Sequence, residues 1–203
     1  MLIIGLTGGL ASGKNFVASC FARFKIPIFD ADLEVHKLLA LDQDIFKQIR
    51  QNFPQAIINN KIDRAVLGKS VFEDKQKLQK LEQIIYPHLR NRENLFIKNC
   101  RKNRQIIAIL NIPLLFEKGG HKRCHKTIAI ITPPKTQLHR FQNRLKTKGM
   151  KDAELIHSKF NNITKHQTND LQRKKLADYT IFNGLNKTFT FRQVKDLIVA
   201  IHY

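Results

Sequence analysis

Residues 3–15 read Ile-Ile-Gly-Leu-Thr-Gly-Gly-Leu-Ala-Ser-Gly-Lys-Asn, and this stretch decides the fold. Gly8 and Gly13 bracket four residues and Lys14 follows, which is the spacing of a phosphate-binding loop. The apolar run before it supplies the buried strand that such a loop follows. A Ser or Thr normally comes after the lysine and binds magnesium through its hydroxyl. Asn15 stands there instead, and we call residues 8–15 the phosphate loop.

A loop of this kind binds anions because glycine allows backbone N–H groups to point at phosphate oxygens, and the helix that follows adds its positive end. Lys14 then bridges the terminal phosphates. An ordinary glycine-rich turn is the alternative, and the strand, the spacing and the lysine together count against it. The amide oxygen of Asn15 also suits a hard cation, so we expect magnesium binding that is weakened and not lost.

The composition fits a folded protein with anionic ligands. The chain has 203 residues, 42% of them hydrophobic and 26% charged, which suits one compact domain. Its formal charge of +20 suggests partners such as nucleotides, coenzymes or nucleic acid. The basic residues are spread along the chain, however. We therefore favour a compositional bias combined with phosphate binding over dedicated nucleic-acid binding.

Cysteines and hydropathy point to a cytoplasmic protein. Cys20, Cys100 and Cys124 lie far apart, which indicates neither a disulfide framework nor a paired-cysteine zinc site. We also reject a metal site at His121, Cys124 and His125, because the three adjacent cations Lys122, Arg123 and Lys126 would repel a metal ion. The first apolar run is too short for a signal peptide, and no stretch approaches the roughly 20 apolar residues of a membrane helix.

Hydrophobic periodicity predicts strands that alternate with helices, and hence an α/β fold with a three-layer arrangement around a parallel sheet. The expected strands cover residues 2–6, 28–29, 106–110, 127–131 and 179–182. A right-handed crossover through the first helix predicts that the first two strands are neighbours.

The first expected helix begins inside the phosphate loop, and its apolar residues from Phe16 to Phe24 recur at helical spacing. Residues 33–102 are mostly helical in pattern, and Pro54 and Pro87 are expected to interrupt them. The remaining helices are predicted at residues 135–148, as a pair within 151–175, and at 190–201.

Two pairs of side chains fit phosphoryl transfer. Asp30 and Asp32 follow the second strand, at the edge where open α/β sheets bind ligands, and a carboxylate there can orient or deprotonate a hydroxyl. A helix N-cap is an equally good interpretation of Asp30. Arg140 and Arg144 lie four apart on a basic helix, and a guanidinium can stabilise a transferring phosphoryl group. A solvated basic face is the common alternative for such a pair.

Further motifs are spread along the chain: Gly5-Leu6-Thr7-Gly8-Gly9 with Gly13-Lys14, Asp30-Ala31-Asp32, Ile62-Asp63-Arg64 with Leu67 and Val71-Phe72, Leu81-Glu82 before Tyr86-Pro87, Ile112-Pro113-Leu114-Leu115-Phe116-Glu117, Gln137 with Arg140 and Arg144, and Ala177-Asp178-Tyr179 with Asn183. With these motifs the chain resembles the dephospho-coenzyme A kinases almost from end to end. The resemblance implies a P-loop kinase fold that transfers the γ-phosphate of ATP to the 3′-hydroxyl of dephospho-CoA, the last step of coenzyme A synthesis, with Mg²⁺.

The resemblance also implies roles for individual residues. Lys14, Asp32 and Arg140 would be catalytic, with Asp32 as the base and Arg140 acting from a lid helix. The implied ATP-binding residues are Gly9, Ala11, Ser12, Gly13, Lys14, Asn15, Phe16, Arg144 and Asn183, with Asn15 also the candidate metal ligand. The implied substrate-binding residues are Asp30, Asp32, Arg64, Pro87, Leu114 and Glu117.

The same resemblance implies one kinase domain over residues 1–203. Its core would comprise about 1–32, 104–134 and 176–203, its helical coenzyme-binding insertion about 33–103, and its lid about 135–175. We expect a monomer.

Several residues depart from the family pattern. Asn15 and Phe16 replace two hydroxyl residues, Tyr86 replaces a histidine, and Asn111 occupies a position that is often acidic. Lys159 stands in for a lid arginine. These changes permit a slow enzyme or a decayed one, and the retention of the three catalytic residues argues against decay. Another P-loop small-molecule or nucleotide kinase, and a non-catalytic nucleotide- or RNA-binding protein, remain alternatives.

Overall fold

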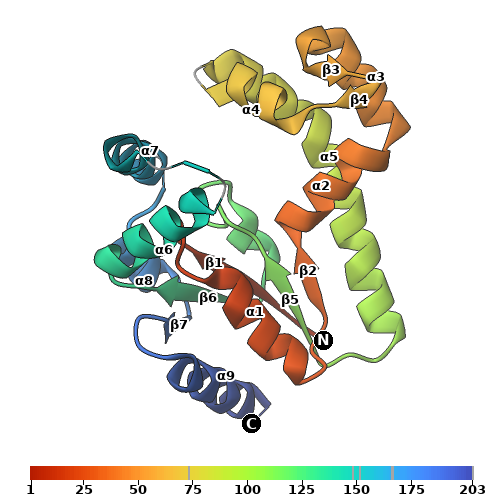
Figure 1. The fold of residues 1–203 in the computed structure, drawn as a ribbon. Coiled ribbons are helices and arrows are strands. Elements are labelled where there is room, and N and C mark those ends of the chain that lie inside the picture. Colours follow the sequence, from red (N-terminus) through yellow and green to blue (C-terminus); the bar gives the residue numbers. More distant parts are fainter. Residues whose placement is uncertain (73, 148, 151, 166, 203) are drawn as a thin grey trace. The chain divides into compact units, whose positions relative to one another are not determined.

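The computed structural model describes residues 1–72, 74–147, 149–150, 152–165 and 167–202 (Figure 1). Contacts divide the chain into two compact units. One comprises residues 1–29 and 104–203, and we call it the sheet unit; the other comprises residues 30–103, and we call it the helical unit. Each is described by itself below.

A five-stranded sheet organises the sheet unit. Its strands are β1 (Leu2–Gly8), β2 (Ile28–Asp30), β5 (Ile107–Asn111), β6 (Lys126–Ile131) and β7 (Tyr179–Phe182). The order across the sheet is β2-β5-β1-β6-β7, and β1 pairs in parallel with both β5 and β6. The predicted α/β fold with a parallel sheet is confirmed.

The prediction that the first two strands are neighbours is wrong. β5 lies between them and pairs with β1 from Leu2↔Ile107 to Leu6↔Asn111. All five residues of β5 are buried, so this apolar strand belongs in the interior of the sheet. The ten-residue helix α1 (Lys14–Arg23) therefore spans one intervening strand before β2 begins.

Side chains of β1 alternate between two covered faces. Ile4 and Leu6 belong to a buried cluster with Val17 and Phe21 of α1, and this cluster also includes Val194 of α9 (Lys187–His202). On the other face, a Cβ added to Gly5 would lie 2.7 Å from Leu115 and 2.8 Å from Cys124. Because successive residues of a strand point to opposite faces, β1 is covered from both sides.

The remaining elements of this unit connect β5, β6 and β7 along the chain. They are η2 (Gly120–Arg123), α6 (Pro134–Lys146), α7 (Ala153–Lys165) and α8 (Asp170–Leu176). Phe141 of α6 packs with Ile156 and Phe160 of α7 in a small separate core. α6 begins one residue before its predicted start and ends at Lys146; the predicted end, residue 148, lies outside the described residues.

The helical unit contains α2 (Ala31–Leu41), α3 (Gln43–Asn52), η1 (Pro54–Ala56), α4 (Arg64–Phe72) and α5 (Lys75–Lys102), with the short hairpin β3 (Ile57–Ile58) and β4 (Lys61–Ile62). Aspartates begin its helices: Asp30 accepts the N–H of Leu33, and Asp42 accepts the N–H groups of Asp44 and Ile45. Its buried core includes Leu38, Ile45 and Ile84.

Two expectations for the helical unit need correction. Pro87 does not interrupt the helix. It lies inside α5, which is 28 residues long and continues on both sides of the proline. Buried side chains on both sides of the proline, Ile84 and Glu93 among them, hold the helix despite the missing N–H. The hairpin was not predicted; its turn residues Asn59 and Asn60 both have positive φ, 49° and 57°, as a two-residue turn of this kind requires.

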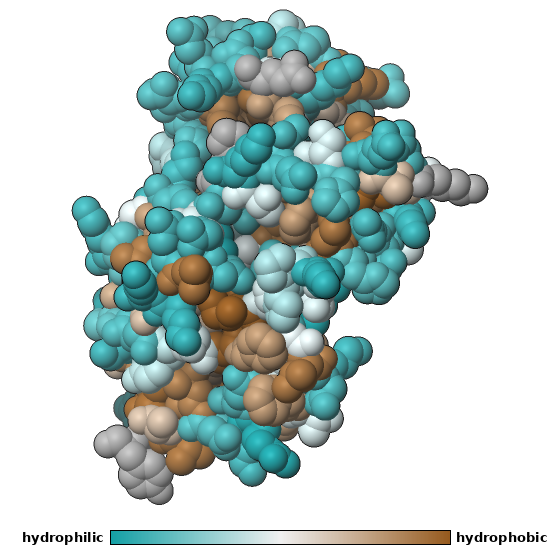
Figure 2. Space-filling model, turned by 90° about the vertical axis from the view of Figure 1, so that its left-hand side faces the viewer, coloured by the Kyte–Doolittle hydropathy of each residue, from teal (hydrophilic) through white to brown (hydrophobic). Residues whose placement is uncertain are grey.

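The surface in Figure 2 is mainly hydrophilic, with separate hydrophobic areas. Among the residues that the structure describes, no helix combines the length and the hydropathy that crossing a lipid bilayer would need.

Candidate active site

The phosphate loop connects β1 to α1 by a strained turn. Gly13, the N-cap of α1, has φ 85°, and Ala11 has φ 56° although it is not a glycine. The N–H of Ser12 donates to the carbonyl of Gly9 at 3.1 Å and closes the turn. A glycine-bounded turn that ends at a helix N-terminus is an anion site by its backbone alone.

Three donors hold the loop from its carbonyl side. The Ser12 oxygen accepts from Thr132 Oγ1 at 2.9 Å, from Arg140 Nη1 at 3.2 Å and from Asn183 Nδ2 at 2.7 Å. These donors come from the segment after β6, from α6 and from the segment after β7. The loop is thus fixed by segments that follow β6 and β7 in the chain.

Lys14 is held by an asparagine at the end of β5. Its Nζ donates to Asn111 Oδ1 at 2.6 Å, and Asn111 Nδ2 donates to Asn15 Oδ1 at 3.3 Å. Asn111 is fully buried, whereas Asn15 is exposed. The two departures from the usual motif therefore contact each other, and two amides surround the lysine where a hydroxyl and a carboxylate would be expected.

Arg140 and Asn183 are brought to the phosphate loop, as their predicted roles require. Arg140 Nη2 also donates to the Asn183 carbonyl at 3.0 Å. The Asn183 side chain is 5% exposed, and its Oδ1 accepts from Thr190 at 3.0 Å. Both amide atoms of Asn183 are thus engaged inside the protein, so its proximity to an adenine stays a prediction.

Other predicted ATP-binding residues have internal contacts as well. The guanidinium of Arg144 lies 5.4 Å from the ring centre of Phe141. Phe16 packs against the sheet core, with Lys187 Nζ at 6.0 Å from its ring centre. Their contacts with nucleotide remain predictions.

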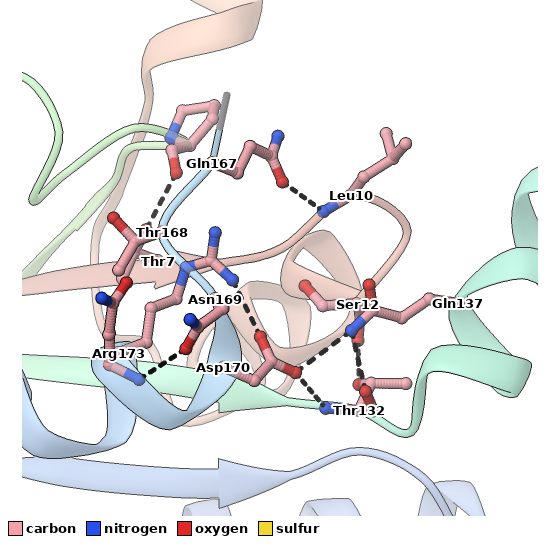
Figure 3. A network of polar contacts seen from close by, with 12 residues as sticks. Thr7, Leu10, Ser12, Thr132, Gln137, Gln167, Thr168, Asn169, Asp170 and Arg173 are labelled. Carbon is pink, nitrogen blue, oxygen red and sulfur yellow. Dashed lines mark hydrogen bonds and ion pairs between the residues drawn. The ribbon is translucent and has the colours of Figure 1, made fainter. Parts of the chain in front are cut away.

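A network of polar side chains lies beside the first half of the loop (Figure 3). Arg173, which is 2% exposed, donates to Asp170 at 2.8 Å and lies 3.6 Å from Glu117. Asp170 accepts from Gln137 Nε2 at 3.1 Å, and Gln137 also donates to the carbonyl of Thr132 at 2.7 Å. The network connects α8, α6 and the end of β6.

Sequence reasoning gave Asp170, Arg173 and Thr132 no role. The available signal was the spacing of polar residues within helices. Asp170 and Arg173 lie three residues apart, as do Gln137 and Arg140. That spacing is also typical of a solvated helix face, so it could not separate the two cases.

Glu117, a predicted substrate ligand, is tied to this network. Its Oε1 accepts the N–H of Thr168 at 2.8 Å. Burial alone would raise the pKa of Glu117, but N–H donation from its own backbone and from Thr168, together with the charge of Arg173, outweighs burial and lowers the pKa. Glu117 is thus an ionised group of the sheet unit. Leu114, another predicted substrate contact, is partly buried, and its carbonyl accepts the N–H of Lys118.

A pocket of about 450 Å³ opens next to this network. Its lining combines Gly9 with Pro133, Phe160, Phe182 and Arg173, among others. Its volume is within the range of small-molecule sites.

The other predicted site residues belong to the helical unit. Asp30 is the N-cap of α2, so the structural interpretation of this residue holds. Asp32 in the first turn of α2, Arg64 at the start of α4 and Pro87 within α5 are exposed. Their side chains are therefore accessible to a ligand.

The part of the chain that the structure describes contains no group of three or more His, Cys, Asp and Glu side chains that could hold a metal ion. Asn15, the predicted metal ligand, is exposed and follows the loop lysine, and its Oδ1 is an oxygen of the kind that Mg²⁺ accepts as a ligand. A neutral amide suits a Mg²⁺ ion that is bound chiefly through nucleotide phosphates.

The fold and the loop define the class of this protein. A parallel sheet with a glycine-bounded loop after its central strand, and an anchored lysine at the helix start, is the arrangement of a P-loop kinase. The structure is similar to the crystal structure of TT1252 from Thermus thermophilus, with a TM-score of 0.82, 25% identity and coverage of 98% and 96% of the two chains. Shikimate kinase from Bacteroides thetaiotaomicron, with a TM-score of 0.53, 14% identity and coverage of 100% and 99%, shares the fold.

The family model for dephospho-CoA kinase matches residues 2–188. The chain is 35% identical to the dephospho-CoA kinase of Gluconobacter oxydans over 98% of this chain and 96% of that protein, and 36% identical to that of Bartonella quintana over 98% and 97%. The chain therefore belongs to the dephospho-CoA kinase family. These relatives indicate an ATP-dependent kinase and confirm the resemblance found in the sequence.

Proposed function

We propose that this protein transfers the γ-phosphate of ATP to the 3′-hydroxyl of dephospho-CoA and so forms coenzyme A. The observation that carries the proposal is the anchored Lys14 at the start of α1, in a chain that matches the family model almost throughout. A phosphate loop alone would not name the acceptor. We also propose that the protein acts in the cytoplasm as a monomer.

The proposed chemistry divides among few residues. The backbone of the phosphate loop and Lys14 bind the β- and γ-phosphates, and Arg140 stabilises the charge on the transferring group. Asp32 accepts the proton of the 3′-hydroxyl as its oxygen bonds to the γ-phosphorus and the bond to the β-phosphate oxygen breaks. Asp30 holds the substrate. Mg²⁺, with Asn15 as its protein ligand, would neutralise charge on the phosphates.

The regions of the chain receive matching roles. Residues 33–103, most of the helical unit, would bind the coenzyme, with Arg64 and Pro87 as contacts. Leu114 and Glu117, which belong to the sheet unit, are the other proposed substrate contacts. Residues 135–175 would form the lid. Positioning the two substrates then supplies much of the rate, because phosphoryl transfer needs little covalent help from the protein.

An assay of ADP release tests the proposal. Purified protein is mixed with ATP and Mg²⁺, and with dephospho-CoA, adenosine, a nucleoside monophosphate or shikimate as the acceptor. We expect ADP release that depends on dephospho-CoA, with coenzyme A as the second product. A Lys14→Met variant serves as the background control. ADP release that is independent of the acceptor would refute the assignment of dephospho-CoA.

A further inference from the structure

The first half of the phosphate loop is supported by residues that follow α7. The N–H of Leu10 donates to Gln167 Oε1 at 2.9 Å, across 157 residues of sequence. Gln167 lies between α7 and α8, outside any helix or strand. Figure 3 shows its side chain extended toward the backbone of Leu10. One side chain from the segment after α7 therefore holds a backbone group of the loop.

The neighbouring residue of the loop is packed against the same region. A Cβ added to Gly9 would lie 3.0 Å from Arg173 Nη1, 3.4 Å from Gln137 Oε1 and 3.6 Å from Asp170 Oδ1. The glycine thus allows its backbone to approach three polar side chains closely. Gly9 and Leu10 rest on a surface made by α6, α8 and Gln167.

That surface is held together by contacts among its own side chains. Arg173 is buried and paired with Asp170, and Asp170 also accepts from Gln137. Removing one partner of the buried Arg173–Asp170 pair would leave the other charge uncompensated and would destabilise the protein, so these two residues are unsuitable for a test by substitution. Gln167 is partly exposed and makes a single neutral hydrogen bond to the loop, so it can be changed without disturbing the buried ion pair.

We propose that Gln167 is a positioning residue for the phosphates of ATP, because it fixes the Gly9–Leu10 half of the phosphate loop from the segment that follows α7. The other half is held through the three donors to the Ser12 carbonyl. With both halves held, the N–H groups between them keep the spacing that phosphate oxygens need. The proposal rests on ATP as the nucleotide of the proposed function.

The test compares Gln167→Met, which removes the acceptor at similar size, with the matched control Gln172→Met on the exposed surface of α8. Calorimetry on the full chain measures the Kd of ATP with and without Mg²⁺, and amide exchange by NMR reports on Leu10. For Gln167→Met we expect a Kd about 3- to 10-fold weaker, the effect of one neutral hydrogen bond, and faster exchange at Leu10. The KM of dephospho-CoA should stay the same, and Gln172→Met should match the wild type.

Two further results decide between positioning and simple stabilisation. Gln167→Glu keeps an acceptor oxygen and should restore the slow exchange of Leu10. If Gln167→Met lowers the Tm but leaves the Kd of ATP unchanged, or if Leu10 exchanges at the wild-type rate, the proposal is overturned. A wild-type protein that binds ATP but fails to phosphorylate dephospho-CoA would refute the proposed function alone, since the Kd comparison does not depend on turnover.

Discussion

The ammonium group of Lys14 donates to the amide oxygen of Asn111 at 2.6 Å, so a neutral side chain holds the lysine of the phosphate loop. A carboxylate at this place would offset the charge of Lys14. The amide orients the lysine without adding a negative charge of its own. The site therefore has amides at residues 15 and 111, and the amide of Asn111 orients Lys14.

Changing Asn111→Leu should weaken ATP binding. The variant keeps the branching at Cγ of this fully buried residue but removes the acceptor for Lys14 and the donor to Asn15. We expect the Kd of ATP to rise about 10-fold or more, since hydrogen bonds to charged groups contribute about 1.5–3 kcal/mol. Calorimetry measures it, with Asn99→Leu on the exposed face of α5 as the control. An unchanged Kd would show that Lys14 is oriented without Asn111.

Changing Asn15→Ser should raise the affinity for Mg²⁺. The hydroxyl restores the usual ligand and no longer competes with the hydrogen bond from Asn111. Titration of the phosphotransfer rate with Mg²⁺ should give half-maximal activity at a lower concentration, and Asn52→Ser on α3 should leave it as it is. An Mg²⁺ dependence identical to that of the wild type would count against Asn15 as the metal ligand.

Changing Asp32→Asn should nearly abolish transfer. If Asp32 is the base, the loss should reach about 10²–10⁴-fold in kcat while the Kd of ATP stays the same. Asp44→Asn is the matched control, because Asp44 is also an exposed aspartate in the first turn of a helix of the helical unit. Turnover retained by Asp32→Asn would assign the base elsewhere.

Changing Gly13→Ala should destabilise the protein and weaken ATP binding together. Gly13 has φ 85°, and a Cβ there would collide with the amide group of Asn183. We expect a loss of about 1–3 kcal/mol in the free energy of unfolding. Gly68→Ala is the contrasting control: an added Cβ meets nothing within 4 Å in α4, so helix propensity predicts a gain of about 0.5–1 kcal/mol. Denaturant unfolding measures both, and equal effects would contradict the role assigned to Gly13.

The state of Glu117 predicts how stability depends on pH. Its pKa is lowered in the folded protein from 4.5, so the unfolded chain binds the proton more tightly. Its contribution to stability is therefore complete above about pH 4.5 and is lost as the pH falls through the lower folded pKa. Unfolding measured between about pH 3 and pH 6 should show a shallower pH dependence for Glu117→Gln than for the wild type. Parallel curves would mean that other carboxyl groups carry the effect.

Local sequence signals predicted much of the fold. The strand Tyr179–Phe182 is predicted to the residue, because a run of β-branched and aromatic residues is bounded there by Asp178 and Asn183. The position of β5 between β1 and β2 could not be predicted, because apolar strands of similar composition do not indicate which strands pair with each other. The predicted interruption at Pro87 was wrong because tertiary packing, which the local sequence does not show, stabilises α5 on both sides of the proline.

The same division applies to the candidate site. The spacing of Gly8, Gly13 and Lys14 after an apolar strand located the phosphate loop, because such a loop binds phosphate through consecutive backbone groups. The network around Arg173 depends on residues distant in sequence, and an arginine three positions after an aspartate looks like a surface pair until its burial is known. The contact of Asn111 with Asn15 likewise joins positions 96 apart in sequence, and no local pattern indicates it.

The order of the sheet has a consequence for how this chain is made. β1 pairs with β5 and β6, so its neighbours begin only at residues 107 and 126. During synthesis from the N-terminus, the apolar segment around Ile3, Ile4 and Leu6 therefore leaves the ribosome long before either partner exists. A nascent chain with an unpaired strand is prone to aggregate or to bind a chaperone. The nucleotide site is thus among the last parts of the molecule to form, although the phosphate loop is translated before the strands that pair with β1.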